Sequence, residues 1–262
     1  MTFAFDLISD LHIDTWPQFD WTGQATSPYC VVAGDVGRDP AAMEDALRHL
    51  ACCYQAVFYI DGNDEHRHQL DDLNGSYQAV EQTLKSIPGV VYLHSDVVII
   101  NGVAILAANG WWSYDFDADI DLEETRVWTQ DRYGFPAPVS NEIELRAYQD
   151  AMYLINSVKR LQTHQEVRRI VLVTHTVPAS WLIEHDLDLR GEYRFNTMGN
   201  SLMSTVLTRD TEHKIDTWCF GHYHKSVDRI SQGVRYVNNC RGRGNTEWKQ
   251  SVYHPKRIEI NF

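Results

Sequence analysis

The segment FAFDLISDLH, residues 3–12, indicates the fold, because a short apolar run in it leads directly into two polar side chains that can bind metal. Residues 3–9 have the pattern of a buried strand, and Asp10 and His12 follow with one residue between them. In extended backbone the first and third side chains of such a triplet lie on the same side. Asp10 and His12 can therefore bind one metal ion together.

The same arrangement, an apolar strand followed at once by polar side chains, recurs four more times along the chain. The strands and the segments that follow them are YCVVA with Gly34-Asp35, AVFYI with residues 61–65 (DGNDE), RIVLV with Thr174-His175, and DTWCF with residues 221–224 (GHYH). Carboxyl ends of strands in α/β sheets gather at one edge, so residues far apart in sequence can converge there. The candidate metal ligands are Asp10, His12, Asp35, Asn63, His175, His222 and His224.

This ligand set combines imidazole, carboxylate and one amide oxygen, without thiolate. Imidazole together with carboxylate suits Mn, Fe or Zn better than an all-oxygen Mg or Ca site. Seven residues exceed what one tetrahedral ion can use, whereas two ions about 3.5–4 Å apart can share a carboxylate and a water molecule. A single such motif is common in turns and helix caps, but five of them in this order, each after an apolar strand, are not explained by turns and caps. We expect two divalent transition metal ions, Mn in preference to Fe or Zn.

The rest of the chain alternates between strand and helix patterns, which indicates one α/β domain over residues 1–262. Further strands are expected at 90–93, 97–100, 103–107, 234–238 and 257–260, and helices at 41–51, 77–86, 141–163 and 201–209. The dipeptide Asn101-Gly102 is typical of a two-residue hairpin turn. Two long stretches, 110–140 and 176–197, look irregular and are expected to cover the site as lid segments.

Composition narrows the class of protein. The formal net charge of −13 argues against a partner that is a nucleic-acid polymer, because such binding depends on Lys and Arg. No run approaches the roughly 18 apolar residues of a membrane-spanning helix, and the N-terminus lacks the basic start of an export signal. We therefore expect no membrane association and a cytoplasmic location. The five cysteines are expected to be free thiols.

The five motifs, DxH, GD, GN(H/D), a His after a strand and GHxH, resemble those of the calcineurin-like metallophosphoesterase superfamily from Asp10 to about Gly244. The resemblance implies two mixed β-sheets packed as a sandwich and flanked by helices, a four-layer α/β fold. It also implies that Asp35 bridges the two metals and that a metal-bridging hydroxide attacks phosphorus. The remaining ligands would divide into Asp10, His12 and His224 for one metal, and Asn63, His175 and His222 for the other.

The sequence departs from the superfamily pattern at one position. Where the common motif has a catalytic His after the Asn, this chain has Asp64. An ionised carboxylate would repel a phosphate, so Asp64 is either protonated, turned toward a partner or metal-bound water, or uninvolved. His66 or His68 is a candidate substitute for the catalytic group.

Three further side chains are candidate substrate contacts. Arg241 and Arg243 can bind phosphate through paired hydrogen bonds, although structural ion pairs are an equal alternative for each. Trp112, beside Trp111 and near Tyr114, can stack a flat organic group, but packing in the core or lid is the favoured interpretation. The acidic run 115–124 is interpreted as a solvated face.

Together these features predict a dinuclear metal-dependent phosphoester hydrolase. Its expected substrate is a small-molecule phosphoester, with a phosphodiester slightly preferred over a phosphomonoester. The alternative is a metal-binding module with little or no turnover, because Asp64 stands where the catalytic His is usual.

Overall fold

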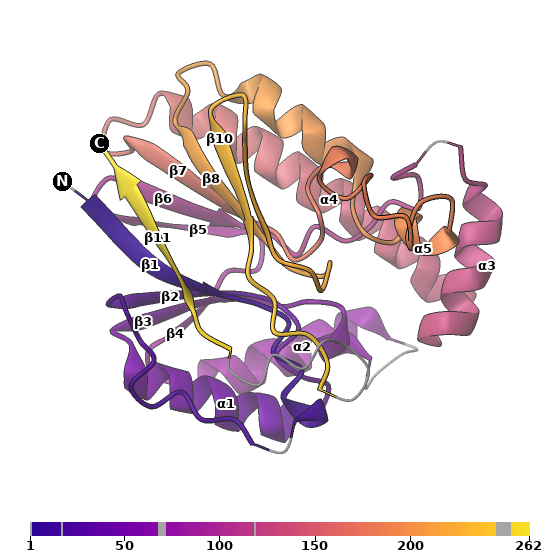
Figure 1. Ribbon diagram of the computed structural model, residues 1–262, viewed down its shortest axis with the longest axis horizontal. Helices are drawn as coiled ribbons and strands as arrows, with labels where there is room; N and C mark the ends of the chain where they lie inside the picture. The colour runs from indigo at the N-terminus through magenta and orange to yellow at the C-terminus, as the bar shows by residue number, and fades with distance from the viewer. Residues whose placement is uncertain (1, 17, 68–71, 118, 245–252) are drawn as a thin grey trace.

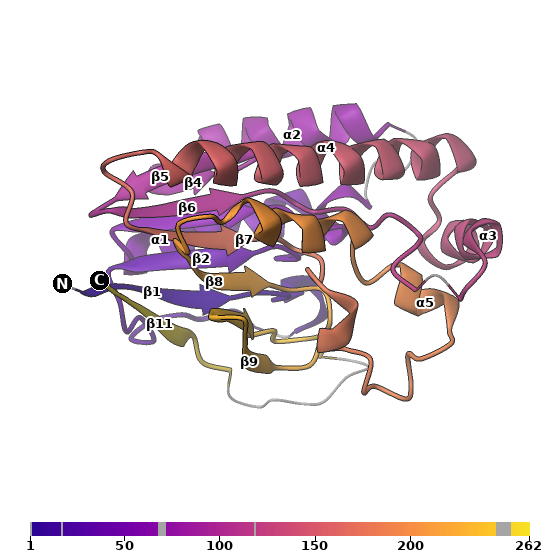
Figure 2. The same ribbon diagram turned by 90° about the horizontal axis from the view of Figure 1, so that it is seen from above.

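Two mixed β-sheets packed face to face form the centre of the computed structural model, which describes residues 2–16, 18–67, 72–117, 119–244 and 253–262 (Figures 1 and 2). The five-stranded sheet has the order β11 (Lys256–Asn261), β1 (Thr2–Ile8), β2 (Tyr29–Ala33), β3 (Ala56–Ile60) and β4 (Val90–Tyr92). The six-stranded sheet has the order β5 (Asp96–Ile100), β6 (Val103–Ala107), β7 (Arg169–Val173), β8 (Ile215–Phe220), β10 (Val234–Asn238) and β9 (Val227–Ser231).

Strand direction brings the ligand segments to one edge. β1 to β4 run parallel, as do β6, β7, β8 and β10, while β11, β5 and β9 are antiparallel additions at the outside. All five motif-bearing strands belong to the parallel sets, and their carboxyl ends meet where the two sheets adjoin.

Helices cover the outer face of each sheet and complete four layers (Figure 1). Between the sheets, side chains such as Phe5, Val31 and Val171 form a buried apolar layer. Helices α1 (Pro40–Cys53) and α2 (Leu73–Lys85) pack on the five-stranded sheet. The other sheet is covered by α4 (Ala137–Gln162) and the 3-10 helix η4 (Ser201–Arg209). This confirms the predicted sandwich.

Local sequence signals explain the element boundaries. The carboxylate of Asp39 accepts a hydrogen bond from Ala41 N at 3.1 Å, and Pro40 opens α1. Asn101 and Gly102 both have positive φ, 52° and 85°, and join β5 to β6 as the hairpin prediction required. The strand β9 was not predicted from the sequence, because this edge strand is exposed and polar over most of its length.

The two stretches expected to be irregular contain short helices, so that prediction was partly wrong. Residues 110–140 include α3 (Leu122–Tyr133) and the start of α4, and residues 176–197 include η3 (Ser180–Leu182) and α5 (Tyr193–Asn196). Helix α3 lacks an apolar stripe and buries only Thr125 and Thr129, so its sequence has no helical periodicity to detect. Asn196 links the two stretches by donating to Ile120 O at 3.4 Å.

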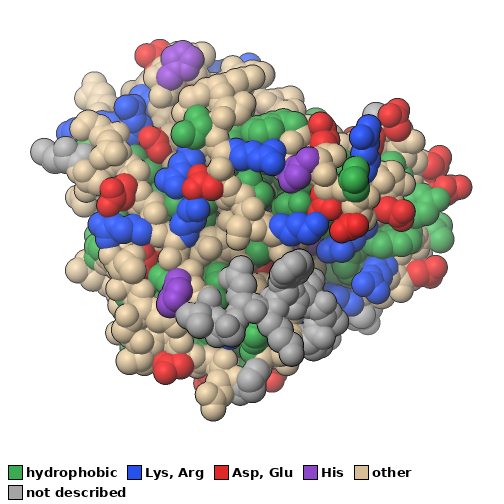
Figure 3. Space-filling model, viewed as in Figure 1, with side chains coloured by type: hydrophobic (Ala, Val, Ile, Leu, Met, Phe, Trp, Pro, Cys, Tyr) green, Lys and Arg blue, Asp and Glu red, His purple; other side chains and the backbone are tan. Residues whose placement is uncertain are grey.

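Acidic side chains gather at the α3 and α5 end of the face in Figure 3, in agreement with the interpretation of residues 115–124 as solvated. The five cysteines are free, as predicted. No helix within the described residues is long and apolar enough to cross a lipid bilayer.

Candidate metal centre

The seven candidate ligands converge at the edge where the two sheets meet. One group, with ligand atoms within 4.8 Å of one another, comprises Asp10, His12, Asp35 and His224, and a second comprises Asp35, His175 and His222. Asp35 belongs to both groups. Asn63 joins the second, because its Oδ1 lies 3.2 Å from His175 Nε2.

The distances between the ligand atoms suit cations that would lie among them. His12 Nε2 and His224 Nε2 are 2.9 Å apart, and His224 Nε2 lies 3.3 Å from Asp10 Oδ1. On the other side of the shared carboxylate, His175 Nε2 lies 3.3 Å from Asp35 Oδ1. Asp35 Oδ2 is buried and accepts no hydrogen bond from any described residue. A buried carboxylate oxygen without a donor fits a cation, so the donor set accommodates two divalent metals.

The ionisation of the ligands also favours metal binding. Burial, to which the neighbouring His175 and Arg194 add, lowers the pKa of His222 well below its usual value, so the ring of His222 is neutral. Burial opposes ionisation of Asp10, but its hydrogen bond and charge interaction with His224 hold its pKa below the usual range. Neutral imidazole and ionised carboxylate are the forms that bind metal.

Backbone groups around the ligands fix the orientation of the rings. His175 Nδ1 lies 2.9 Å from Ala33 O, which directs Nε2 toward Asp35. His222 Nε2 lies 3.0 Å from Thr197 O, which leaves Nδ1 facing the other ligands. The backbone N–H of His222 donates to both Asp10 oxygens, at 2.9 and 3.1 Å.

Backbone strain is concentrated in the ligand segments. Asp10, His12, Asp35 and His222 all have positive φ, at 50°, 41°, 55° and 64°. For residues other than Gly this region costs on the order of 1–3 kcal/mol each and is typical of functional sites. The surrounding packing therefore holds these four residues in conformations that direct their side chains into the two ligand groups.

The glycines of the GD and GN motifs allow the segments to approach one another. A Cβ on Gly34 would lie 2.5 Å from His175 Nδ1. A Cβ on Gly62 would overlap the carboxylate of Asp35 and lie 2.6 Å from Asp35 N. Only glycine fits at both positions without displacing a ligand.

Glu65 joins the GD and GN segments, a role that the sequence analysis missed. Its buried carboxylate accepts hydrogen bonds from the backbone N–H groups of Val36 at 2.6 Å, Gly62 at 2.8 Å and Asp35 at 3.2 Å. An acidic residue two positions after Asn63 was the available signal, but nothing in the spacing distinguishes it from a solvated side chain.

Asp64 is an ionised carboxylate shared by several cations. Its side chain is fully buried and lies 3.1 Å from Arg38 Nε and 3.5 Å from Arg67 Nη1, and it also pairs with Arg243. On its other side, Asp64 Oδ2 is 3.2 Å from His12 Nδ1. Burial opposes ionisation, but the contact with His12 and the charges of Arg243 and Arg38 hold the pKa of Asp64 well below its usual range. Of the alternatives left by the sequence, the geometry matches a carboxylate turned toward partners.

The other sequence-predicted site residues lie in different places. His66 does not face the ligands, because its Nε2 and Nδ1 are each 2.9 Å from a neighbour, Asp61 and Ser76 respectively. His68 lies outside the described residues. Trp112 is buried, with its ring stacked 5.7 Å from that of His222. Arg241 lies over Trp16, 4.2 Å from the ring centroid.

A pocket of about 540 Å³ opens onto the ligands. It is lined by Asp35, Arg38, Asn63, Arg67, Arg132, Tyr133, Arg194, Met198, His222, His224 and Arg243. Arg243 was expected here, but Arg241 is not among the lining residues. Four of the arginines were missed by the sequence analysis. Only Arg38 and Arg67 carried a signal, since they follow Asp35 and Asn63 by three and four residues.

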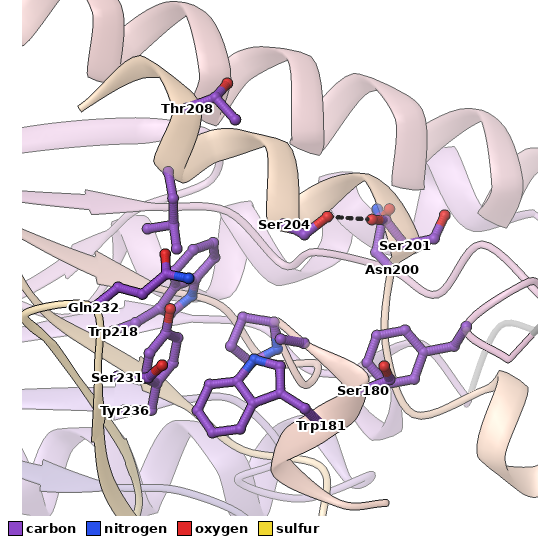
Figure 4. A pocket seen from close by; sticks show the side chains of 14 residues that line it. Ser180, Trp181, Asn200, Ser201, Ser204, Thr208, Trp218, Ser231, Gln232 and Tyr236 are labelled. Carbon is purple, nitrogen blue, oxygen red and sulfur yellow. Dashed lines mark hydrogen bonds between the residues drawn. The ribbon is translucent and has the colours of Figure 1, made fainter. Parts of the chain in front are cut away.

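A second pocket, of about 440 Å³, lies apart from the ligands (Figure 4). Trp181, Trp218 and Tyr236 contribute aromatic surface, and serines and amides make up much of the remainder. None of the described residues that line it is charged or a candidate metal ligand. Of these two pockets, the arginine-rich one is therefore the candidate functional site.

The sheet order, the helical layers and the ligands at the strand ends define the class: the chain has the calcineurin-like metallophosphoesterase fold, as its motifs predicted. Among solved structures it is similar to phosphopantetheinyl hydrolase from Mycobacterium tuberculosis, with a TM-score of 0.66 and 18% identity, over 97% of this chain and 95% of that one. It is also similar to a dimetal phosphatase from Danio rerio, with a TM-score of 0.51 and 13% identity, over 90% and 86% of the two chains.

Sequence comparison adds one distant relative. An uncharacterized protein of Acanthamoeba polyphaga mimivirus is 17% identical over 235 residues, which cover 82% of this chain and 78% of that protein. No family model matches the chain. At these identities the similarity establishes the fold, and the activity must be argued from the site.

Proposed function

We propose that this protein is a dinuclear metal-dependent phosphoester hydrolase. The observation that carries the proposal is the sharing of Asp35 between two groups of buried imidazole and carboxylate ligands. When bound there, two divalent cations would supply a nucleophile from a shared water molecule and neutralise the phosphoryl oxygens. Mn is the preferred metal, with Fe or Zn as alternatives, because the donor set is mixed nitrogen and oxygen.

Asp64 acts in this proposal as a positioning residue and not as the leaving-group acid. Its ionised carboxylate has no proton to donate, and its contacts hold the guanidinium groups of Arg38 and Arg243 beside the metal ligands. Guanidinium groups pair with phosphoryl oxygens through parallel hydrogen bonds and remain charged throughout turnover. They would stabilise negative charge at the position where the superfamily usually has a His.

The proposed substrate is a small-molecule phosphoester, with a diester slightly preferred. Arginines do not protonate a leaving group, so a site with arginines in place of the His suits a substrate whose leaving group departs without protonation. The similar structures are a phosphopantetheinyl hydrolase and a dimetal phosphatase, and their activities support phosphoester cleavage as the reaction class.

The deciding experiment is hydrolysis of bis-p-nitrophenyl phosphate and p-nitrophenyl phosphate by protein that has been stripped of metal and then supplied with Mn²⁺. We expect turnover of the diester that depends on the added metal. Binding of two Mn²⁺ per chain without turnover of either ester would instead support the metal-binding module with little or no turnover. Failure to bind two metals would overturn both functions.

A further inference from the structure

The pocket over the candidate metal centre is much more basic than the rest of the protein. Five of its lining residues are arginines, although the chain as a whole carries a net charge of −13. They come from five separate segments: Arg38 follows β2, Arg67 follows the 3-10 helix η2 (Asp64–His66), Arg132 is in the last turn of α3, Arg194 is in α5, and Arg243 follows β10. Among the described residues, no lysine lines the pocket. A set of this kind points to an anionic ligand, such as phosphate, whose oxygens accept paired hydrogen bonds from the planar guanidinium groups.

Three of the arginines form an inner group beside the ligands. Arg38, Arg67 and Arg243 share the single carboxylate of Asp64. Burial and the neighbouring charges of Arg38 and Arg243 lower the pKa of Arg67, which Asp64 only partly offsets. Positive charge therefore remains in excess here, ready for the phosphate that would be cleaved.

Arg132 and Arg194 form a second group among the residues that line the pocket. Both residues are exposed, and neither makes an ion pair with a carboxylate in the described part of the chain. Helices α3 and α5, which carry them, are joined by a 2.5 Å hydrogen bond from Tyr193 Oη to Glu124 and by Asn196, whose Nδ2 donates to Thr125 Oγ1 at 3.4 Å. The pairing of these helices brings the two guanidinium groups to the same pocket from the two lid segments.

One phosphate at the metals does not account for both groups. A diester carries one negative charge at its phosphate and a monoester at most two. The inner arginines together with two divalent cations exceed that charge, even after the carboxylates of Asp10, Asp35 and Asp64 are subtracted. We propose that the substrate is a phosphoester bearing a second phosphate group, which Arg132 and Arg194 bind while the scissile phosphate lies over the metals. This inference rests on the proposed hydrolase function and specifies its substrate class.

The test uses two diesters that differ only in the second phosphate, thymidine 5′-(p-nitrophenyl phosphate) and its 3′-phosphorylated derivative. With Mn²⁺-loaded protein we expect kcat/KM to be at least about tenfold higher for the 3′-phosphorylated diester, mainly through KM, since a charge-assisted contact is worth on the order of a tenfold change in affinity. Arg132→Gln and Arg194→Gln should each bring the ratio toward one. Arg209→Gln, an exposed arginine of η4 outside the pocket, should keep the wild-type ratio.

A binding measurement separates this inference from the hydrolase proposal. By calorimetry, Mn²⁺-loaded protein should bind thymidine 3′,5′-bisphosphate about tenfold more tightly than thymidine 5′-monophosphate, and Arg194→Gln should remove the difference. Equal kcat/KM for the two diesters, or a preference that survives both arginine substitutions, would overturn the second-phosphate site and leave the hydrolase standing. Absence of turnover with a tenfold binding preference would overturn the hydrolase and keep the site.

Discussion

Replacement of Asp64 by Asn tests the central feature of this site, a buried carboxylate shared by several cations. The substitution keeps the shape of the side chain and removes its charge. Asp64 is 0% exposed, whereas the side chains of Arg67 and Arg243 are each 20% exposed and that of Arg38 is 39% exposed. The variant would leave three guanidinium groups close together without their common anion.

The expected loss of stability follows from these exposures. Removing one partner of a fully buried ion pair costs about 3–5 kcal/mol, but water screens partly exposed guanidinium groups, so we expect about 2 kcal/mol here. In a chain of this length that loss lowers Tm by about 4–8 °C. The contribution should be fully present at pH 7, because a carboxyl whose pKa falls on folding stabilises the protein above its unfolded pKa of about 3.9.

Thermal unfolding at pH 7, followed by circular dichroism in the presence of Mn²⁺, measures the effect. Asp188→Asn is the matched control, because that carboxylate is 92% exposed and lies 3.8 Å from Lys225. A double-mutant cycle with Arg243→Gln should give a double variant that loses less stability than the sum of the single variants. If Asp64→Asn melts within 1 °C (~0.3 kcal/mol) of Asp188→Asn, Asp64 does not hold the arginine group together.

Three further substitutions test other parts of the structure. Asp35→Asn removes the negative charge that both ligand groups share, so metal analysis should find less than two Mn²⁺ per chain and the diesterase rate should fall at least about a hundredfold. Full metal occupancy in this variant would contradict bridging by Asp35. Gly62→Ala should impair metal binding because the added Cβ would overlap the Asp35 carboxylate, whereas Gly191→Ala, with positive φ but no atom within 4 Å, should not. Burial raises the pKa of Asp150 to about 6, so the contribution of Asp150 to stability should fall by about 2 kcal/mol as pH rises from 4 to 7. In urea unfolding, the wild type should lose about this much stability relative to Asp150→Asn over that range, and an identical pH profile would contradict the raised pKa.

The strands and the candidate ligands that follow them were predictable from the sequence. Each motif follows a short apolar run that is typical of a buried strand, and parallel strands place their carboxyl ends at one edge. Asp10, Asp35 and His175 could therefore be assigned to one site without coordinates. The edge strand β9 and the helix α3 were not predicted, because neither has the periodic apolar residues of an element that packs one face against the core.

The surroundings of those candidate ligands could not be predicted from the sequence. Arg132 and Arg194 reach the pocket because α3 and α5 pack together, and no local pattern encodes the proximity of two segments separated by 62 positions. The environment of Asp64 could not be predicted either. From the sequence, its carboxylate would repel a phosphate, whereas in the structure that charge is paired with Arg38 and Arg243. Strand patterns are repeated along the chain and can be read locally, whereas the charge balance of a pocket is a sum over side chains that only folding brings together.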